Sequence, residues 1–257
     1  MKNKLNYLII IFLLSFLLPA KLVLASGFAV NTYHVLEKQM RKEHSLDYVA
    51  KKISDLHDYH EWPAEVSTDL KLYVGINWFN QHHLAESMTL LDSIKPEKKY
   101  YDLWVYYQAM IKLFITQPEQ ARSYVAYLSK NYHNDVDYLF LESVLRSQSN
   151  DLIGAIKIMD QITKKSKRNG HAYLQRGYFH MLAYSHSLAM KDFDKAIKYL
   201  PKNEINKRQQ ALLQNGVLYV RYKFKQKKGL AMIQEGTALN PSSELVKQVN
   251  EALRQRF

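Results

Sequence analysis

The chain has 257 residues, with no cysteine, 8 glycines and 6 prolines, and its 36 basic side chains outnumber the 24 acidic ones. The lack of cysteine excludes disulfides, thiolate metal sites and cysteine nucleophiles, and the sequence holds neither a P-loop nor a dinucleotide-binding glycine motif. An apolar share of 47% argues against disorder, and the low glycine and proline content favours helices.

Residues 1–25 have the pattern of a signal peptide. Two lysines precede an apolar run over residues 8–18, and Pro19 and a small-residue cleavage site at residues 23–25 follow it. The run is short for a membrane-spanning helix, and no later segment is apolar enough to cross a bilayer. We therefore expect an exported protein, periplasmic or secreted in a bacterial host and not transmembrane after processing. The alternative is an uncleaved N-terminal anchor.

Residues 26–67 are expected to form capping helices, because residues 30–60 have the pattern of one or two helices that end before Pro63. His57 and His60 in this segment would share one face of a helix, as in some metal sites. No third ligand is evident, so we expect exposed or capping histidines and no bound metal.

Residues 68–203 repeat with a period of 34 residues, which is typical of stacked helix–turn–helix repeats. Four positions keep the same kind of side chain in all four copies, the first two small and the last two apolar. They are Gly75, Ala109, Ser143 and Gly177; Ser87, Ala121, Ala155 and Ala189; Leu91, Val125, Met159 and Phe193; and Ile94, Leu128, Ile162 and Ala196. Small side chains fit where two helices cross most closely, and no repeat can bury its apolar face without its neighbours.

The clearest copy, residues 170–203, resembles a tetratricopeptide repeat (TPR). The residues that match the family pattern are Gly177, Ala189, Phe193, Ala196 and Pro201. Two positions depart from it, with Arg176 where leucine is usual and His180 where tyrosine is usual. The resemblance implies an all-α fold, a right-handed α-solenoid of about five helical hairpins with helical caps in one continuous domain.

Residues 204–241 are interpreted as a degenerate, extended fifth repeat. Its first helix is expected to run from Ile205 to Gln226 and to end near Gly229. The second-helix pattern is assigned to Ala231, Glu235 and Ala238. Residues 242–257 then hold a C-terminal capping helix over Glu244–Gln255, with Ser242 or Ser243 as its N-cap.

The resemblance also implies a concave surface lined by the first helix of each repeat. Carried over to this chain, the apolar and aromatic residues that would line it are Leu72, Ile76, Phe79, Tyr106, Met110, Phe114, Phe140, Val144, Tyr178 and Met181. This set favours a groove for an apolar helix or extended segment of a protein partner. The alternative is that the solenoid is tightly wound or that the N-terminal helices fill the groove, so that these residues are ordinary core.

Positive charge gathers near the C-terminus, where residues 204–257 hold ten basic and four acidic side chains. The densest group contains Arg221, Lys223, Lys225 and Lys228. Helical spacing would place Arg221, Lys225 and Lys228 on one face. Such a surface would bind anionic polysaccharide or lipid headgroups. The alternative is a solvated basic face, and nucleic acid is not expected as a partner of an exported chain.

No catalytic constellation and no cofactor motif is evident in the sequence, so we do not expect an enzyme. The favoured function is an exported TPR adaptor or scaffold that mediates protein–protein interaction in an envelope or secretion assembly. The alternative is an accessory protein that binds acidic exopolysaccharide or lipid headgroups through the basic C-terminal surface.

Overall fold

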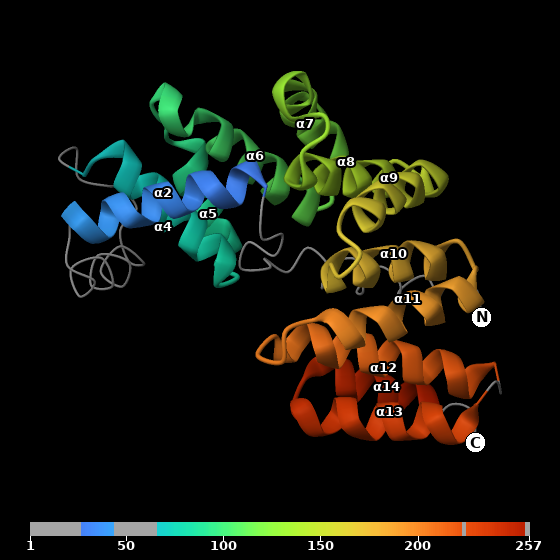
Figure 1. The fold of residues 1–257 in the computed structure, drawn as a ribbon. Coiled ribbons are helices and arrows are strands. Elements are labelled where there is room, and N and C mark those ends of the chain that lie inside the picture. Colours follow the sequence, from blue (N-terminus) through green and yellow to red (C-terminus); the bar gives the residue numbers. More distant parts are fainter. Residues whose placement is uncertain (1–26, 44–65, 223–224, 255–257) are drawn as a thin grey trace. The chain divides into compact units, whose positions relative to one another are not determined.

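A computed structural model describes residues 27–43, 66–222 and 225–254. In these ranges the chain forms twelve helices and no strand, which confirms the predicted all-α fold (Figure 1). None of the helices in the same ranges combines the length and apolar character needed to cross a bilayer. The predicted signal peptide and the pair His57 and His60 lie outside the described residues.

The chain divides into two compact units, unit 1 (Met1–Asp151) and unit 2 (Leu152–Phe257), whereas the sequence was interpreted as one continuous domain. The division falls inside the third predicted repeat, between its two helices. The described helices of unit 1 are α2 (Phe28–Glu43), α4 (Thr68–Asn80), α5 (Leu84–Asp92), α6 (Lys98–Phe114), α7 (Pro118–Tyr132) and α8 (Val136–Gln148). Helices α4 and α5 form one hairpin and α6 and α7 the next, while α6 also packs against α4 and α8.

Unit 2 is built in the same way from two hairpins and two flanking helices. Its described helices are α9 (Leu152–Lys165), α10 (Gly170–Leu182), α11 (His186–Tyr199), α12 (Ile205–Arg221), α13 (Gln226–Leu239) and α14 (Glu244–Arg254). Helix α10 pairs with α11 and α12 with α13, α9 packs against α10, and α14 packs against α12.

All the repeat positions identified in the sequence are buried. In the first repeat, a Cβ on Gly75 would lie 2.6 Å from Leu91 Cδ2, and the Ser87 hydroxyl donates to the Gly75 carbonyl at 2.8 Å. In the fourth, a Cβ on Gly177 would lie 2.8 Å from Phe193 Cε1. The first and second helices therefore touch where the sequence has small residues, as the 34-residue period predicted.

A backbone turn repeats with the same period. His82, Thr116, Asn150 and Tyr184 are 34 residues apart, and each has a positive φ, between 57° and 71°. Each follows the C-cap of a first helix, and the next amide donates to the carbonyl five residues back, for example Ser185 N to His180 O at 2.8 Å. This left-handed residue with its closing bond is the Schellman ending of a helix, here made without glycine.

The fifth hairpin differs from its predicted register. Helix α12 ends at Arg221, and Gly229 lies inside α13 rather than at the end of α12. A Cβ on Gly229 would lie 2.8 Å from the Gly216 carbonyl oxygen, so two glycines mark the point where α12 and α13 touch. The second-helix positions are therefore Gly229, Ile233 and Gly236, which are buried, whereas the predicted Ala231, Glu235 and Ala238 are exposed.

The C-terminal helix begins at Glu244 as predicted, and its predicted last residue, Gln255, lies outside the described residues. Ser243 Oγ accepts a hydrogen bond from the Val246 amide at 3.3 Å, as expected for its N-cap. The helix buries Val246 and Val249 in one cluster with Leu213 of α12 and Ile233 of α13. It thus covers the apolar side of the last hairpin.

Candidate functional site

Helix α2 lies across unit 1 and contacts α4, α6 and α8, the first helices of three successive repeats (Figure 1). We call the side of unit 1 that α2 contacts the inner face. The apolar residues of α2 that meet it are spaced as one helical stripe and are at most 8% exposed: Ala29, Tyr33, Leu36 and Met40. On the opposite side of α2, Val35 is 52% exposed. An amphipathic helix is therefore seated on the first helices, the elements that the sequence analysis expected to face a partner.

Aromatic rings anchor the first half of α2. The Phe28 ring stacks on Tyr132 at a centroid distance of 3.8 Å and meets Tyr106 edge-on at 5.8 Å. One turn later the Tyr33 ring stacks on Tyr73 at 5.9 Å. Burial raises the pKa of the Tyr33 phenol well above its ordinary value, so this side chain stays neutral even in mildly alkaline solution.

Two carboxylates from the start of α8 bind the beginning of α2. The Phe28 amide donates to Asp135 Oδ2 at 3.2 Å, and the Ala29 amide donates to Asp137 Oδ2 at 2.8 Å. Asp135 is also the N-cap of α8, where its Oδ1 accepts from the Asp137 amide at 2.8 Å. The positive N-terminal ends of α2 and α8 thus meet the same pair of carboxylates. Of the two, Asp137 is buried, with only 1% of its surface exposed. A Cβ on Gly27 would collide with the Asp137 carboxylate.

Polar side chains hold the second half of α2. Gln39 Oε1 accepts from the Tyr100 hydroxyl at 2.5 Å and from Lys99 Nζ at 2.9 Å. Gln39 Nε2 donates to Asp69 Oδ2 at 3.4 Å. The helix is therefore tied to α4 and α6 at this end and to α8 at the other.

The structure buries most of the residues predicted to line a groove. Phe140 and Met181 are half-buried, and the other eight are buried: Leu72, Ile76, Phe79, Tyr106, Met110, Phe114, Val144 and Tyr178. Tyr106 contacts α2 through Phe28. At Tyr106 the N-terminal helix α2 thus occupies the inner face of unit 1, and a partner-binding role of the predicted set stays a prediction.

Several residues that hold α2 were missed by the sequence prediction. Asp69 and Asp137 occupy the same position of two repeats, 68 residues apart, but the prediction kept only apolar side chains at the inner-face positions. The period itself could have identified this pair. Tyr73 and Tyr100 lie outside the positions that the family pattern assigns to the groove, so the pattern gave no signal for them.

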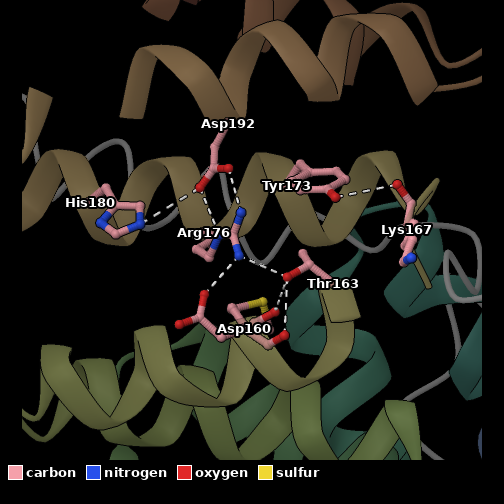
Figure 2. A network of polar contacts seen from close by, with 8 residues as sticks. Asp160, Thr163, Lys167, Tyr173, Arg176, His180 and Asp192 are labelled. Carbon is pink, nitrogen blue, oxygen red and sulfur yellow. Dashed lines mark hydrogen bonds and ion pairs between the residues drawn. The ribbon is translucent and has the colours of Figure 1, made fainter. Parts of the chain in front are cut away.

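Unit 2 buries a charged network that joins α9, α10 and α11 (Figure 2). The Arg176 guanidinium donates to both carboxylate oxygens of Asp192 at 2.6 and 2.7 Å, and also to Asp160 Oδ1 and Thr163 Oγ1 at 2.7 Å each. His180 Nε2 lies 3.7 Å from Asp192 Oδ2. Burial lowers the pKa of His180, and the Asp192 charge opposes this shift only in part. Both departures from the TPR pattern, Arg176 and His180, therefore belong to one network.

The basic cluster does not have the predicted geometry. Arg221 ends α12, Lys225 is the N-cap of α13 and Lys228 lies in the first turn of α13, so the three do not share one helical face. Lys228 Nζ is 3.1 Å from each carboxylate oxygen of Asp194 and 3.1 Å from the Tyr219 hydroxyl. Lys223 lies outside the described residues. An anion-binding role for this surface stays a prediction.

Comparisons with known proteins identify the fold class. No family model matches the chain, and no curated protein matches it. The fold is similar to the crystal structure of a tetratricopeptide repeat protein from Parabacteroides merdae, with a TM-score of 0.61 and 9% sequence identity over 86% of this chain and 82% of that one. The chain therefore has a TPR-like helical repeat fold. In the described ranges no group of three histidine, aspartate or glutamate side chains could hold a metal ion.

Proposed function

We propose that the protein is an exported adaptor or scaffold whose unit 1 binds a helix of a partner protein in an envelope or secretion assembly. The observation that carries this proposal is that the inner face of unit 1 already accommodates an amphipathic helix, α2, through an apolar stripe and polar contacts at both ends. The TPR-like fold supports protein binding. The export of the chain rests on the signal-peptide pattern of residues 1–25.

Crosslinking in the native host tests this function. A C-terminally tagged chain is crosslinked in intact cells, and the captured proteins are identified by mass spectrometry. We expect one or two envelope proteins to be enriched over a host that expresses an unrelated tagged periplasmic protein. A capture that contains no protein above this background contradicts the adaptor function. Protease accessibility of the tag in spheroplasts tests export separately, because a cytoplasmic tag stays protected.

The second candidate is the binding of acidic exopolysaccharide or lipid headgroups. It is favoured by the exposed side chains of Arg221, Lys225 and Lys227, which lie at the end of α12 and the beginning of α13. Electrostatic binding of this kind weakens steeply as the salt concentration rises. The triple change of these residues to glutamine should abolish binding to acidic polysaccharide or anionic vesicles. Lys247→Gln, which removes an exposed lysine from α14, is the control.

A further inference from the structure

We propose that the inner face of unit 1 recognises its ligand by the N-terminal end of a helix. In this proposal, which rests on the proposed function, Asp135 and Asp137 fix the direction of the bound helix. The contact at Gly27 fixes its register, and α2 is an intramolecular competitor of a partner helix with the same start. The partner helix would begin with glycine, an aromatic residue and a small residue, followed by an apolar stripe.

The direction of the ligand follows from the two carboxylates. The first turn of a helix presents free N–H groups and the positive end of the helix dipole, whereas the last turn presents free carbonyl groups and the negative end. Asp135 and Asp137 accept from two such N–H groups of α2. A helix seated in the opposite direction would place carbonyl oxygens against the buried Asp137 carboxylate. The site therefore selects one of the two directions.

The register follows from the residues at the start of α2. A side chain at position 27 would overlap the Asp137 carboxylate, so any residue other than glycine would displace this carboxylate from its bond with the Ala29 amide. The next residue, Phe28, places its ring against Tyr132 and Tyr106. The third, Ala29, is fully buried. A shift of the helix by one residue would bring a side chain to the glycine position and move the ring away from its partners.

Helix α2 is suited to act as a competitor because the hairpins of unit 1 have cores that do not include it. In the first hairpin, the contacts of Gly75 with Ser87 and Leu91 join α4 to α5 directly. In the second hairpin, α7 buries Ala121, Val125 and Leu128. Helix α2 adds one stripe of side chains on the far side of the first helices. It is joined to α4 by residues 44–67, so it acts at the high effective concentration of a tethered ligand. An external helix must displace it.

The competition by α2 can be tested by a crosslink, because the chain has no cysteine of its own and two introduced cysteines can be linked selectively. The probe is a synthetic peptide with the sequence of residues 27–43, acetylated at its N-terminus and labelled with fluorescein at its C-terminus. Its binding to the full mature chain is measured by fluorescence anisotropy in three forms of the protein. The first form is the wild type. The second carries Leu36→Glu, which loosens α2. The third carries Gln39→Cys and Lys99→Cys, and a short bis-maleimide linker between these two cysteines holds α2 in place.

We expect Leu36→Glu to bind the peptide at least about tenfold more tightly than the wild type, and the linked form not to bind it. In the Leu36→Glu chain, adding Asp137→Ala should weaken binding by about tenfold or more, and so should Gly27→Ala in the peptide. Two matched controls should leave binding unchanged: Val35→Ala in the peptide, which alters an exposed side chain, and Glu119→Ala on the exposed side of α7. Circular dichroism checks that Leu36→Glu keeps its helices, and Met40→Ala replaces it if it does not.

Four results would overturn the proposal. A Gly27→Ala peptide that binds as well as its parent contradicts the register rule. Equal binding by the wild type, Leu36→Glu and linked forms shows that α2 does not compete. A wild-type dimer that Leu36→Glu abolishes in sedimentation experiments assigns the site to α2 of a second copy. A partner captured equally well by the linked form leaves the adaptor function intact and shows that the partner binds elsewhere.

Discussion

The two units use the same helical hairpins but hold their first helices in place by different additional contacts. In unit 1 an additional helix, α2, covers α4, α6 and α8 with an apolar stripe and is capped by Asp135 and Asp137. In unit 2 the charged side chains of Arg176 and Asp192 tie α10 to α11, and Asp160 adds α9. The comparison teaches that the repeat period specifies the close helix crossings of each hairpin, whereas the remaining contacts of the first helices come from residues outside the pattern.

The largest expected effect is that of Arg176→Leu, which installs the side chain usual at this TPR position. The change leaves the Asp192 carboxylate, 5% exposed, without its bidentate partner. We expect the free energy of unfolding to fall by about 3–5 kcal/mol in urea titrations that report on unit 2. The double variant with Asp192→Leu should recover most of the loss, because it no longer buries an uncompensated charge. A single variant as stable as the wild type would show that the network does not stabilise unit 2.

Leu36→Ala in α2 tests whether the cover of unit 1 can be loosened separately. The leucine is fully buried, and its truncation should reduce the stability of the docked helix by about 2–4 kcal/mol. Hydrogen exchange should therefore quicken at the amides of α2 and stay unchanged in α10 to α13. Quickened exchange throughout the α4–α5 hairpin would contradict the separation of α2 from the hairpin cores.

A third prediction concerns the pH dependence of unit 2. Burial lowers the pKa of Lys207 from 10.5 to about 8, and its ion pair with Glu204, at 3.2 Å, opposes the shift. Between pH 8 and 10.5 the unfolded chain keeps the lysine proton that the folded chain has lost. Stability should therefore rise with pH across this window, and this group contributes no pH dependence below it.

The difference between the wild type and Lys207→Met isolates this contribution from tyrosine titration. We expect the wild type to gain about 1–2 kcal/mol relative to the variant between pH 8 and 10. Urea unfolding at a series of pH values measures it. A constant difference across the window would mean that Lys207 keeps its ordinary pKa in the folded chain.

The smallest expected effect comes from the left-handed turns that both units contain. Thr116 is β-branched and exposed, and its φ of 57° is a conformation that glycine adopts more easily. Thr116→Gly should therefore raise the free energy of unfolding of unit 1 by about 0.5–1 kcal/mol, measured by thermal unfolding. Asn150→Gly is the matched comparison, because asparagine already tolerates this conformation and the gain should be smaller. A loss of stability on Thr116→Gly would show that the threonine side chain contributes contacts that outweigh the strain.

The sequence predicted the hairpin interiors well, because close helix crossings admit few side chains. The small residues at Gly75, Ser87, Gly177 and Ala189 all lie where the period placed them. The register predicted for the fifth hairpin is wrong by two residues. It assigns Ala231 and Ala238 to the buried positions that Gly229 and Gly236 occupy. The single helical face assigned to Arg221, Lys225 and Lys228 was wrong because α12 ends at Arg221 and Lys228 belongs to a second helix, α13.

The cover of the inner face could not be predicted from the repeat. Residues such as Tyr106 have the same apolar character whether they meet a partner or a helix of the same chain. Since Tyr106 is 7% exposed against Phe28, a substitution such as Tyr106→Glu would bury a charge and disturb unit 1 itself. It cannot serve as a clean test of partner binding, and the linked form of α2 is the better one.

The placement of α8 has a practical consequence for dividing the chain into expression fragments. A cut at the boundary between the second and third repeats, near residue 135, would remove the helix that carries Asp135 and Asp137 from the face that it completes. A cut after the third repeat would instead attach α9 to the first fragment and take Asp160 away from Arg176. The fragments that keep both sets of contacts meet between Asp151 and Leu152, within a repeat.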